Sequence, residues 1–138
     1  MASTKVSIET TIAADGNKVW DYWTKPEYIT KWNFASDDWH CPAAENDLRP
    51  GGKYKARMEA KDGSFGFDFE AVYDEVIDKK KISYTMGDGR QATTLFENGG
   101  GKTKVSVTFD AENENPVDMQ KAGWFAILEN FRKYTETH

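Results

Sequence analysis

The stretch NPVDMQKAGWFAILENFRKY, residues 115–134, decides the fold, because it predicts a long helix with one buried face. Asn115 is a residue type that caps helices, and Pro116 suits the first helical position, where its missing N–H costs no hydrogen bond. Four apolar residues then recur at spacings of three and four, the spacing of one helical face. These residues are Trp124, Ile127, Leu128 and Phe131. Such a face needs a partner surface to bury it.

The residues before this helix alternate in the manner of β-strands. Residues 5–12 place apolar side chains on one face and polar ones on the other, which predicts a half-buried strand. Two short helices follow, one capped by Asp15 and one with Pro26 in its first turn. About six further strands, separated by turns such as Asp62-Gly63 and Gly99-Gly100-Gly101, lead to the last helix. Consecutive strands with helices at the ends indicate antiparallel pairing and an α+β fold.

The composition restricts the classes of function. The chain has 138 residues and suits one domain, 1–138, with its own core. The net charge is −5 without any basic cluster, so we expect no binding to nucleic acid or anionic membrane. No stretch approaches the roughly 20 apolar residues of a membrane-spanning helix, and the first residues lack the apolar block of a signal peptide. The single cysteine, Cys41, favours a reducing compartment, the cytoplasm.

Short motifs along nearly the whole chain match a known family. They are Val19-Trp20, Trp32-Asn33-Phe34, Asp47-Leu48-Arg49-Pro50-Gly51-Gly52, Asp62-Gly63 and Gly123-Trp124. On these residues the chain resembles the START-like, or Bet v 1-like (SRPBCC), superfamily. The closest likeness is to bacterial stand-alone domains of the group named after the C-terminal domain of the activator of Hsp90 ATPase. The resemblance implies a helix-grip fold, in which a curved seven-stranded antiparallel sheet wraps around the last helix and two short helices follow the first strand.

The resemblance also implies functions. Members of the superfamily enclose an elongated hydrophobic cavity and bind lipids, sterols, polyketides or plant hormones, and some catalyse cyclisation or hydrolysis. We therefore expect a small hydrophobic or aromatic ligand between the sheet and the C-terminal helix, without a cofactor and without catalysis. A polyketide cyclase-like enzyme is one alternative, with Tyr54, Tyr84 and His40 as the groups to test. A chaperone-associated module is another, which we discount because the likeness is to the second domain of eukaryotic activators only.

The ligand contacts are expected among the aromatic residues, which make up 14% of the chain. The expected contacts are Trp32, Phe34, Tyr54, Phe67, Phe69, Tyr84, Met86, Trp124, Leu128 and Phe131. The Tyr54 and Tyr84 hydroxyls would orient a polar end of the ligand or form hydrogen bonds within the core. The alternative is that these side chains simply fill the space between sheet and helix, and the sequence leaves both readings open.

The polar residues suggest weaker candidates for chemistry. His40 and Cys41, with Asp37 and Asp38 nearby, contain the residue types of acid–base or Cys–His catalysis. However, neighbouring residues of a strand point to opposite faces, and no third and fourth ligand at a recognisable spacing supports a metal site. We therefore expect neither a catalytic centre nor a metal site here.

Two further charged groups have a structural and a functional interpretation. Arg49 could bind a ligand carboxylate at a cavity mouth, but a partner such as Asp47 in the same turn is the favoured interpretation. Asp68 and Glu70 could form a hydrolytic pair in a cavity. Their alternation with the apolar face that contains Phe67 instead predicts that both carboxylates face solvent.

Overall fold

The structure, a computed structural model, describes residues 4–138 and contains one sheet and three helices among them. The elements follow the expected order. They are β1 (Lys5–Ile12), α1 (Gly16–Thr24), α2 (Pro26–Trp32), β2 (Trp39–Asn46), β3 (Lys53–Ala60), β4 (Gly66–Ile77), β5 (Lys81–Met86), β6 (Gln91–Gly99), β7 (Lys102–Asp110) and α3 (Val117–Thr137).

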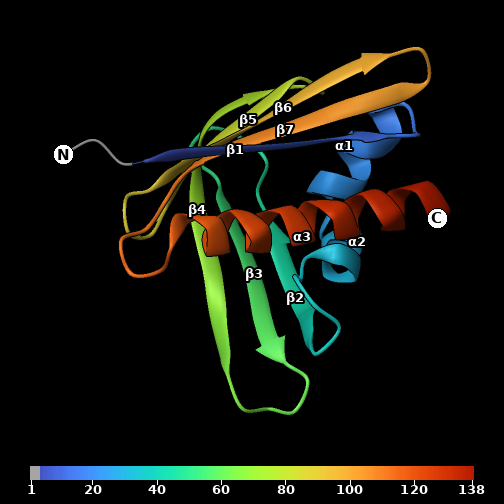
Figure 1. Ribbon diagram of the computed structural model, residues 1–138. Helices are drawn as coiled ribbons and strands as arrows, with labels where there is room; N and C mark the ends of the chain where they lie inside the picture. Colours follow the sequence, from blue (N-terminus) through green and yellow to red (C-terminus); the bar gives the residue numbers. More distant parts are fainter. Residues whose placement is uncertain (1–3) are drawn as a thin grey trace.

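The strands form one antiparallel sheet in the order β1-β7-β6-β5-β4-β3-β2. The sheet curls around α3, which lies across its concave side (Figure 1). Register shifts near His40 in β2 and near Tyr73 in β4 mark irregular pairing, which bends strands. The α+β helix-grip fold with seven strands is therefore confirmed.

The connection from β1 to β2 explains why one end of the hollow is closed. β1 and β2 are the two edge strands of the sheet, so the chain must cross from one edge to the other between them. α1 and α2 make this crossing and lie beside the C-terminal half of α3 (Figure 1). The Asp15 carboxylate accepts hydrogen bonds from the Asn17 and Lys18 amides, which confirms it as the cap of α1.

Aromatic packing fills this closed end. Phe131 is 0% exposed, and its ring lies 4.9 Å from Trp23 and 4.8 Å from Trp32, edge-on to both. Trp23 and Trp32 stack on each other with their centroids 5.0 Å apart. The Asn130 side chain donates to the Trp32 carbonyl at 2.8 Å, which fixes α3 against α2. Together these contacts make a densely packed end.

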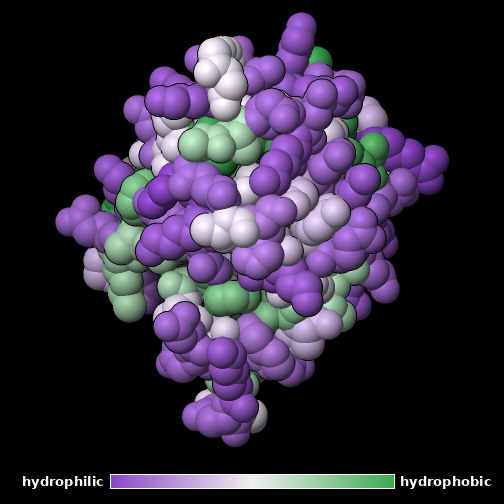
Figure 2. Space-filling model, turned by 90° about the vertical axis from the view of Figure 1, so that its right-hand side faces the viewer, coloured by the Kyte–Doolittle hydropathy of each residue, from purple (hydrophilic) through white to green (hydrophobic). Residues whose placement is uncertain are grey.

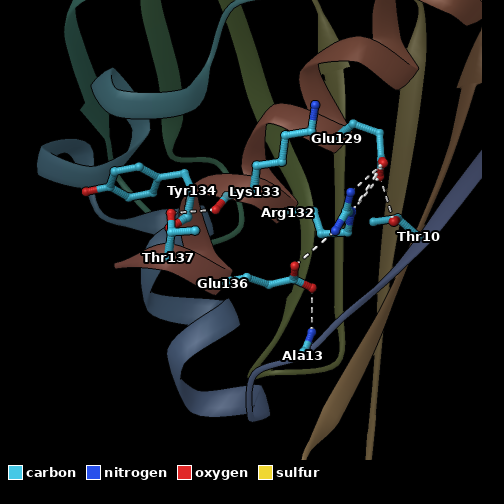
Figure 3. Close-up of polar contacts among 8 residues, drawn as sticks. All are labelled: Thr10, Ala13, Glu129, Arg132, Lys133, Tyr134, Glu136 and Thr137. Carbon is cyan, nitrogen blue, oxygen red and sulfur yellow. Dashed lines mark hydrogen bonds and ion pairs between the residues drawn. The ribbon is translucent and has the colours of Figure 1, made fainter.

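Polar contacts hold the same half of α3 to β1 (Figure 3). The Thr10 hydroxyl donates to Glu129 at 2.7 Å, and the Ala13 amide donates to Glu136 at 2.9 Å. Arg132 lies between the two carboxylates and donates to Glu129 at 3.1 Å and to Glu136 at 2.9 Å. The guanidinium neutralises both acids, so the helix presents them to β1 at a smaller electrostatic cost.

The start of α3 differs from the prediction by one residue. The helix begins at Val117, and Pro116 is the capping residue, with an extended backbone at ψ 141°. The prediction that Asn115 caps the helix is therefore wrong, and its side chain instead donates to the Glu112 carboxylate. The Gln120 side chain satisfies this turn by accepting from the Glu112 amide at 2.8 Å and donating to the Asn115 carbonyl at 2.8 Å. None of the helices described is both long and apolar enough to span a membrane.

Candidate functional site

A pocket of about 430 Å³ lies between the N-terminal half of α3 and the curled sheet. Its walls come from every strand except β2 and from all three helices, and they are mainly apolar. The aromatic packing around Phe131 closes the space toward α1 and α2, whereas in the N-terminal half Trp124 stacks on Phe109 and the pocket lies beside it. The fold thus leaves room where the sheet diverges from the helix.

Most of the predicted ligand contacts meet at this pocket. Those that line it are Trp32, Tyr54, Phe67, Phe69, Tyr84, Trp124 and Leu128. They come from separate helices and strands, so the sheet curvature and the helix position bring them together. Tyr54, Phe69 and Tyr84 form one wall: Phe69 stands edge-on to both tyrosines, with centroids 6.0 Å from each.

The other three predicted residues lie outside the pocket. Phe131 belongs to the packed end, where Trp23 and Trp32 already enclose it. Met86, at the end of β5, is buried in the main core. Phe34 follows α2 and packs against a small separate cluster around Cys41. For Met86 and Phe131 the predicted face is buried, but the periodic pattern gave no position along the strand or helix; Phe34 lies between α2 and β2, where no periodic pattern applies.

The three pocket tyrosines differ in the hydrogen bonds that their hydroxyls make. The Tyr73 hydroxyl donates to the Asn46 side chain at 2.6 Å, and the Tyr54 hydroxyl accepts from the Asn33 side chain at 3.1 Å. Tyr84 lines the same pocket, and among residues 4–138 its hydroxyl has no hydrogen-bond partner. Tyr84 therefore offers the pocket a donor that no protein group uses.

Burial keeps these tyrosines protonated. Desolvation raises the pKa of Tyr54, Tyr73 and Tyr84 above the usual value, because a phenolate is poorly solvated inside the protein. The nearby Tyr84 raises the pKa of Tyr54 further. At neutral pH the three side chains are uncharged hydrogen-bond donors or acceptors, and they are poorly suited to act as bases.

The mouth of the pocket is aromatic. Phe67 lines the pocket and is also 41% exposed, and its ring centroid lies 6.1 Å from both Trp39 and Phe65. Phe67 lies at the start of β4 and Phe65 just before it, in the β3–β4 hairpin, which extends away from α3 (Figure 1), and Trp39 lies at the start of β2. Figure 2 shows the lowest tip of this hairpin as hydrophilic, and the surface around it carries hydrophobic residues only in small separate areas. The aromatic rings therefore connect the interior to solvent beside a polar turn.

The turn Asp47–Gly52 supports one wall of the pocket. The Gly51 amide donates to the Tyr73 carbonyl at 2.8 Å, and the Tyr73 amide donates to the Gly52 carbonyl at 3.0 Å. A Cβ at Gly52 would lie 2.0 Å from the Asp47 carbonyl oxygen, so only glycine fits there. Arg49 donates to Asp47 at 2.9 Å, is well exposed and does not line the pocket. The structural interpretation of this motif therefore holds.

The other polar candidates lie away from the pocket. His40 is partly exposed and lies 3.6 Å from Glu59, whereas Cys41 is buried in its own small cluster. Asp68 faces solvent near Lys55 and Arg57, as the alternation predicted. Within residues 4–138, no group of three or more His, Cys, Asp or Glu side chains could hold a metal ion.

Several lining residues were not predicted. Ile8, Tyr73 and Ile82 share a strand face with residues that the alternation did identify, so the same signal could have found them. Arg90 and Glu112 also line the pocket, but they lie in turns without periodicity. The guanidinium of Arg90 pairs with Asp88 at 2.7 Å.

Comparison with known proteins gives consistent matches. A family model described as "Activator of Hsp90 ATPase homolog 1-like protein" matches residues 13–136. The solution structure of an AHSA1-like protein from Aeromonas hydrophila is 42% identical, with a TM-score of 0.92, and the match covers 97% of this chain and 93% of that one. The solution structure of a protein from Cytophaga hutchinsonii is 47% identical, with a TM-score of 0.83, covering 96% and 92%.

A more distant structure shares the fold. A protein from Nitrosomonas europaea is 20% identical, with a TM-score of 0.84, and the match covers 96% of this chain and 94% of that one. A search of curated proteins finds no match. The resemblance drawn from the sequence motifs is thus confirmed, including its likeness to bacterial proteins of about this length.

Proposed function

The chain belongs to the family of activator of Hsp90 ATPase homolog 1-like proteins, and from this premise we propose that it binds a small apolar or aromatic ligand in the pocket beside α3. The pocket itself is the observation that supports the proposal. Its volume of about 430 Å³ falls in the range of roughly 300–1,000 Å³ typical of small-molecule sites. Its lining is mostly apolar with a few polar groups, which is also typical of such sites.

The mouth supports the same proposal. An apolar ligand gains free energy by leaving water, and the rings of Phe67, Phe65 and Trp39 give it a continuous apolar surface from solvent to the interior. Trp124 forms part of the far wall, where Phe109 stacks on it at 4.0 Å and holds its ring in place. A rigid wall binds with less loss of conformational entropy than a mobile one.

Binding without catalysis agrees best with the polar groups. Catalysis by proton transfer needs a group that titrates near the working pH, whereas burial raises the pKa of the pocket tyrosines away from neutrality. His40, the histidine considered for a cyclase-like activity, does not line the pocket. A chaperone-associated module would instead require a binding surface, and the AHSA1-like family name alone supports that alternative.

Fluorescence of a neutral apolar dye, Nile red, tests the proposal. We expect saturable binding to the wild-type protein with a blue-shifted emission. Ile127→Trp enlarges a lining residue and should weaken binding at least fivefold, because the larger ring occupies part of the pocket. Leu95→Trp is the matched control, since Leu95 is 40% exposed and lies outside the pocket.

The circular dichroism spectrum and Tm of each variant show whether it is folded. Failure of Nile red to bind the folded wild-type protein would contradict the proposal, as would equal binding to the two folded variants.

A further inference from the structure

We propose that the pocket selects uncharged ligands that carry a hydrogen-bond acceptor, such as an aromatic ketone or ester, and that the Tyr84 hydroxyl donates to this acceptor. The inference rests on the proposed function, because it specifies the ligand class of the same pocket. Two observations support the inference: the Tyr84 hydroxyl has no partner among residues 4–138, and the charged residues that line the pocket do not favour an anion.

Tyr84 is the tyrosine of the aromatic wall whose hydroxyl has no hydrogen-bond partner among residues 4–138. Tyr73 already donates to Asn46, whereas Tyr54 accepts from Asn33, which holds its hydroxyl in place but leaves its own proton free. The Tyr84 ring is held on two sides, edge-on to Phe69 at 6.0 Å and edge-on to Tyr73 at 6.3 Å. A fixed ring directs its hydroxyl without further ordering, so an acceptor on the ligand gains a hydrogen bond at little entropic cost.

The hydroxyl acts as a donor because it keeps its proton. Burial raises the pKa of Tyr84, so it carries a proton throughout the physiological range. A ligand oxygen without its own proton, as in a ketone or an ester, complements such a donor. A pure hydrocarbon would leave the hydroxyl buried without a partner, which costs free energy.

The charges near the pocket do not favour an anion. Among residues 4–138, Arg90 is the cationic residue that lines the pocket, and its guanidinium pairs with Asp88 at 2.7 Å. Glu112 adds a carboxylate to the lining itself. A ligand carboxylate would therefore enter an apolar pocket whose positive charge is already balanced.

Three probes that share one ring system distinguish binding of an uncharged acceptor, a hydrocarbon and an anion. They are 2-ethylnaphthalene, 2-acetylnaphthalene and 2-naphthoate at pH 7, each measured by isothermal titration calorimetry or by displacement of Nile red. For the wild-type protein we expect the ketone to bind about five- to tenfold tighter than the hydrocarbon, the size of one hydrogen bond. We expect the carboxylate to bind at least tenfold weaker than the ketone.

Variants then assign the effect to one hydroxyl. Tyr84→Phe should weaken ketone binding about five- to tenfold and change hydrocarbon binding less than twofold. Tyr28→Phe removes a hydroxyl from α2, outside the pocket, and should change neither.

The outcomes separate this inference from the proposed function. If the probes bind but Tyr84→Phe weakens the ketone and the hydrocarbon equally, the role of Tyr84 is wrong and the pocket still binds ligands. Tightest binding of 2-naphthoate, lost in Arg90→Gln, would identify an anion site and overturn the inference. If neither the probes nor Nile red bind the folded wild-type protein, both the inference and the proposed function fail.

Discussion

The two halves of α3 meet the sheet in different ways. In the C-terminal half, Phe131 is fully buried between tryptophans, and Arg132 bridges acids that reach β1. In the N-terminal half, Trp124 stacks on Phe109, and a pocket of about 430 Å³ separates much of the remaining helix surface from the strands. One half of the helix therefore stabilises the fold, and the other half forms the roof of the pocket.

The largest expected difference between the halves concerns truncated phenylalanines. Phe131→Ala should lower the free energy of unfolding by about 3–5 kcal/mol, because it leaves a cavity in tightly packed rings. Phe67→Ala, at the half-exposed mouth, should cost about 1 kcal/mol or less. Chemical denaturation measures both values. Equal losses would show that the two regions do not differ in packing.

High pH should reveal the buried tyrosines of the pocket. Tyrosine ionises near pH 10 in the unfolded chain, whereas burial raises the pKa of Tyr54 and Tyr84 in the folded protein. The unfolded state therefore loses protons first, and the free energy of unfolding falls as the pH rises above about 10. Each tyrosine contributes a slope of up to about 1.4 kcal/mol per pH unit.

Denaturation between pH 9 and pH 11.5 tests this prediction. The double variant Tyr54→Phe/Tyr84→Phe should retain more of its stability at the upper end of this range than the wild-type protein does. An unchanged slope in the double variant would contradict the burial of these two hydroxyls.

The ion pairs of Arg132 with Glu129 and Glu136 should contribute less to the free energy of unfolding than the aromatic rings at the same end do. Arg132→Ala leaves Glu129 and Glu136 close together without their shared partner. We expect a loss of about 1 kcal/mol, because all three side chains are partly exposed and water screens the charges. Thermal or chemical denaturation at low and high salt measures it. A loss as large as that of Phe131→Ala would mean that polar contacts dominate this end.

The smallest effect concerns two helical glycines. A Cβ at Gly123 of α3 meets no atom within 4 Å, so Gly123→Ala should stabilise the protein by about 0.5–1 kcal/mol through helix propensity. A Cβ at Gly16 of α1 would lie 3.1 Å from Asn98. Gly16→Ala should therefore bring no gain. A loss of stability in Gly123→Ala would indicate that this part of α3 is more closely packed than the structure describes.

Periodicity predicted which face of an element is buried but not where along the element a residue lies. The helical spacing placed Trp124 and Phe131 on one face, and both face inward. With 21 residues, α3 is about 31 Å long, so these two residues reach different environments. The strand alternation likewise predicted that Asp68 faces solvent and Phe69 faces inward, and both are confirmed.

Residues outside helices and strands follow no periodic pattern, so the sequence could not predict their place in the structure. Arg90 lies in the connection between β5 and β6, and its side chain lines the pocket. The start of α3 was predicted one residue early, because Asn115 and Pro116 are both favourable near a helix start and only backbone geometry distinguishes their positions. The environment of the Tyr84 hydroxyl also depends on the three-dimensional structure, since the rings next to Tyr84 come from β3 and β4.

Methyl NMR of the protein with 2-acetylnaphthalene tests the central claim most directly, because isoleucines occur in both regions. Ile8, Ile82 and Ile127 line the pocket, whereas Ile12 and Ile29 are buried outside it. We predict saturable shift changes for the first three δ1 methyl groups and none for the other two. Absence of any shift, or the largest shifts at Ile12 and Ile29, would contradict a ligand pocket under the N-terminal half of α3.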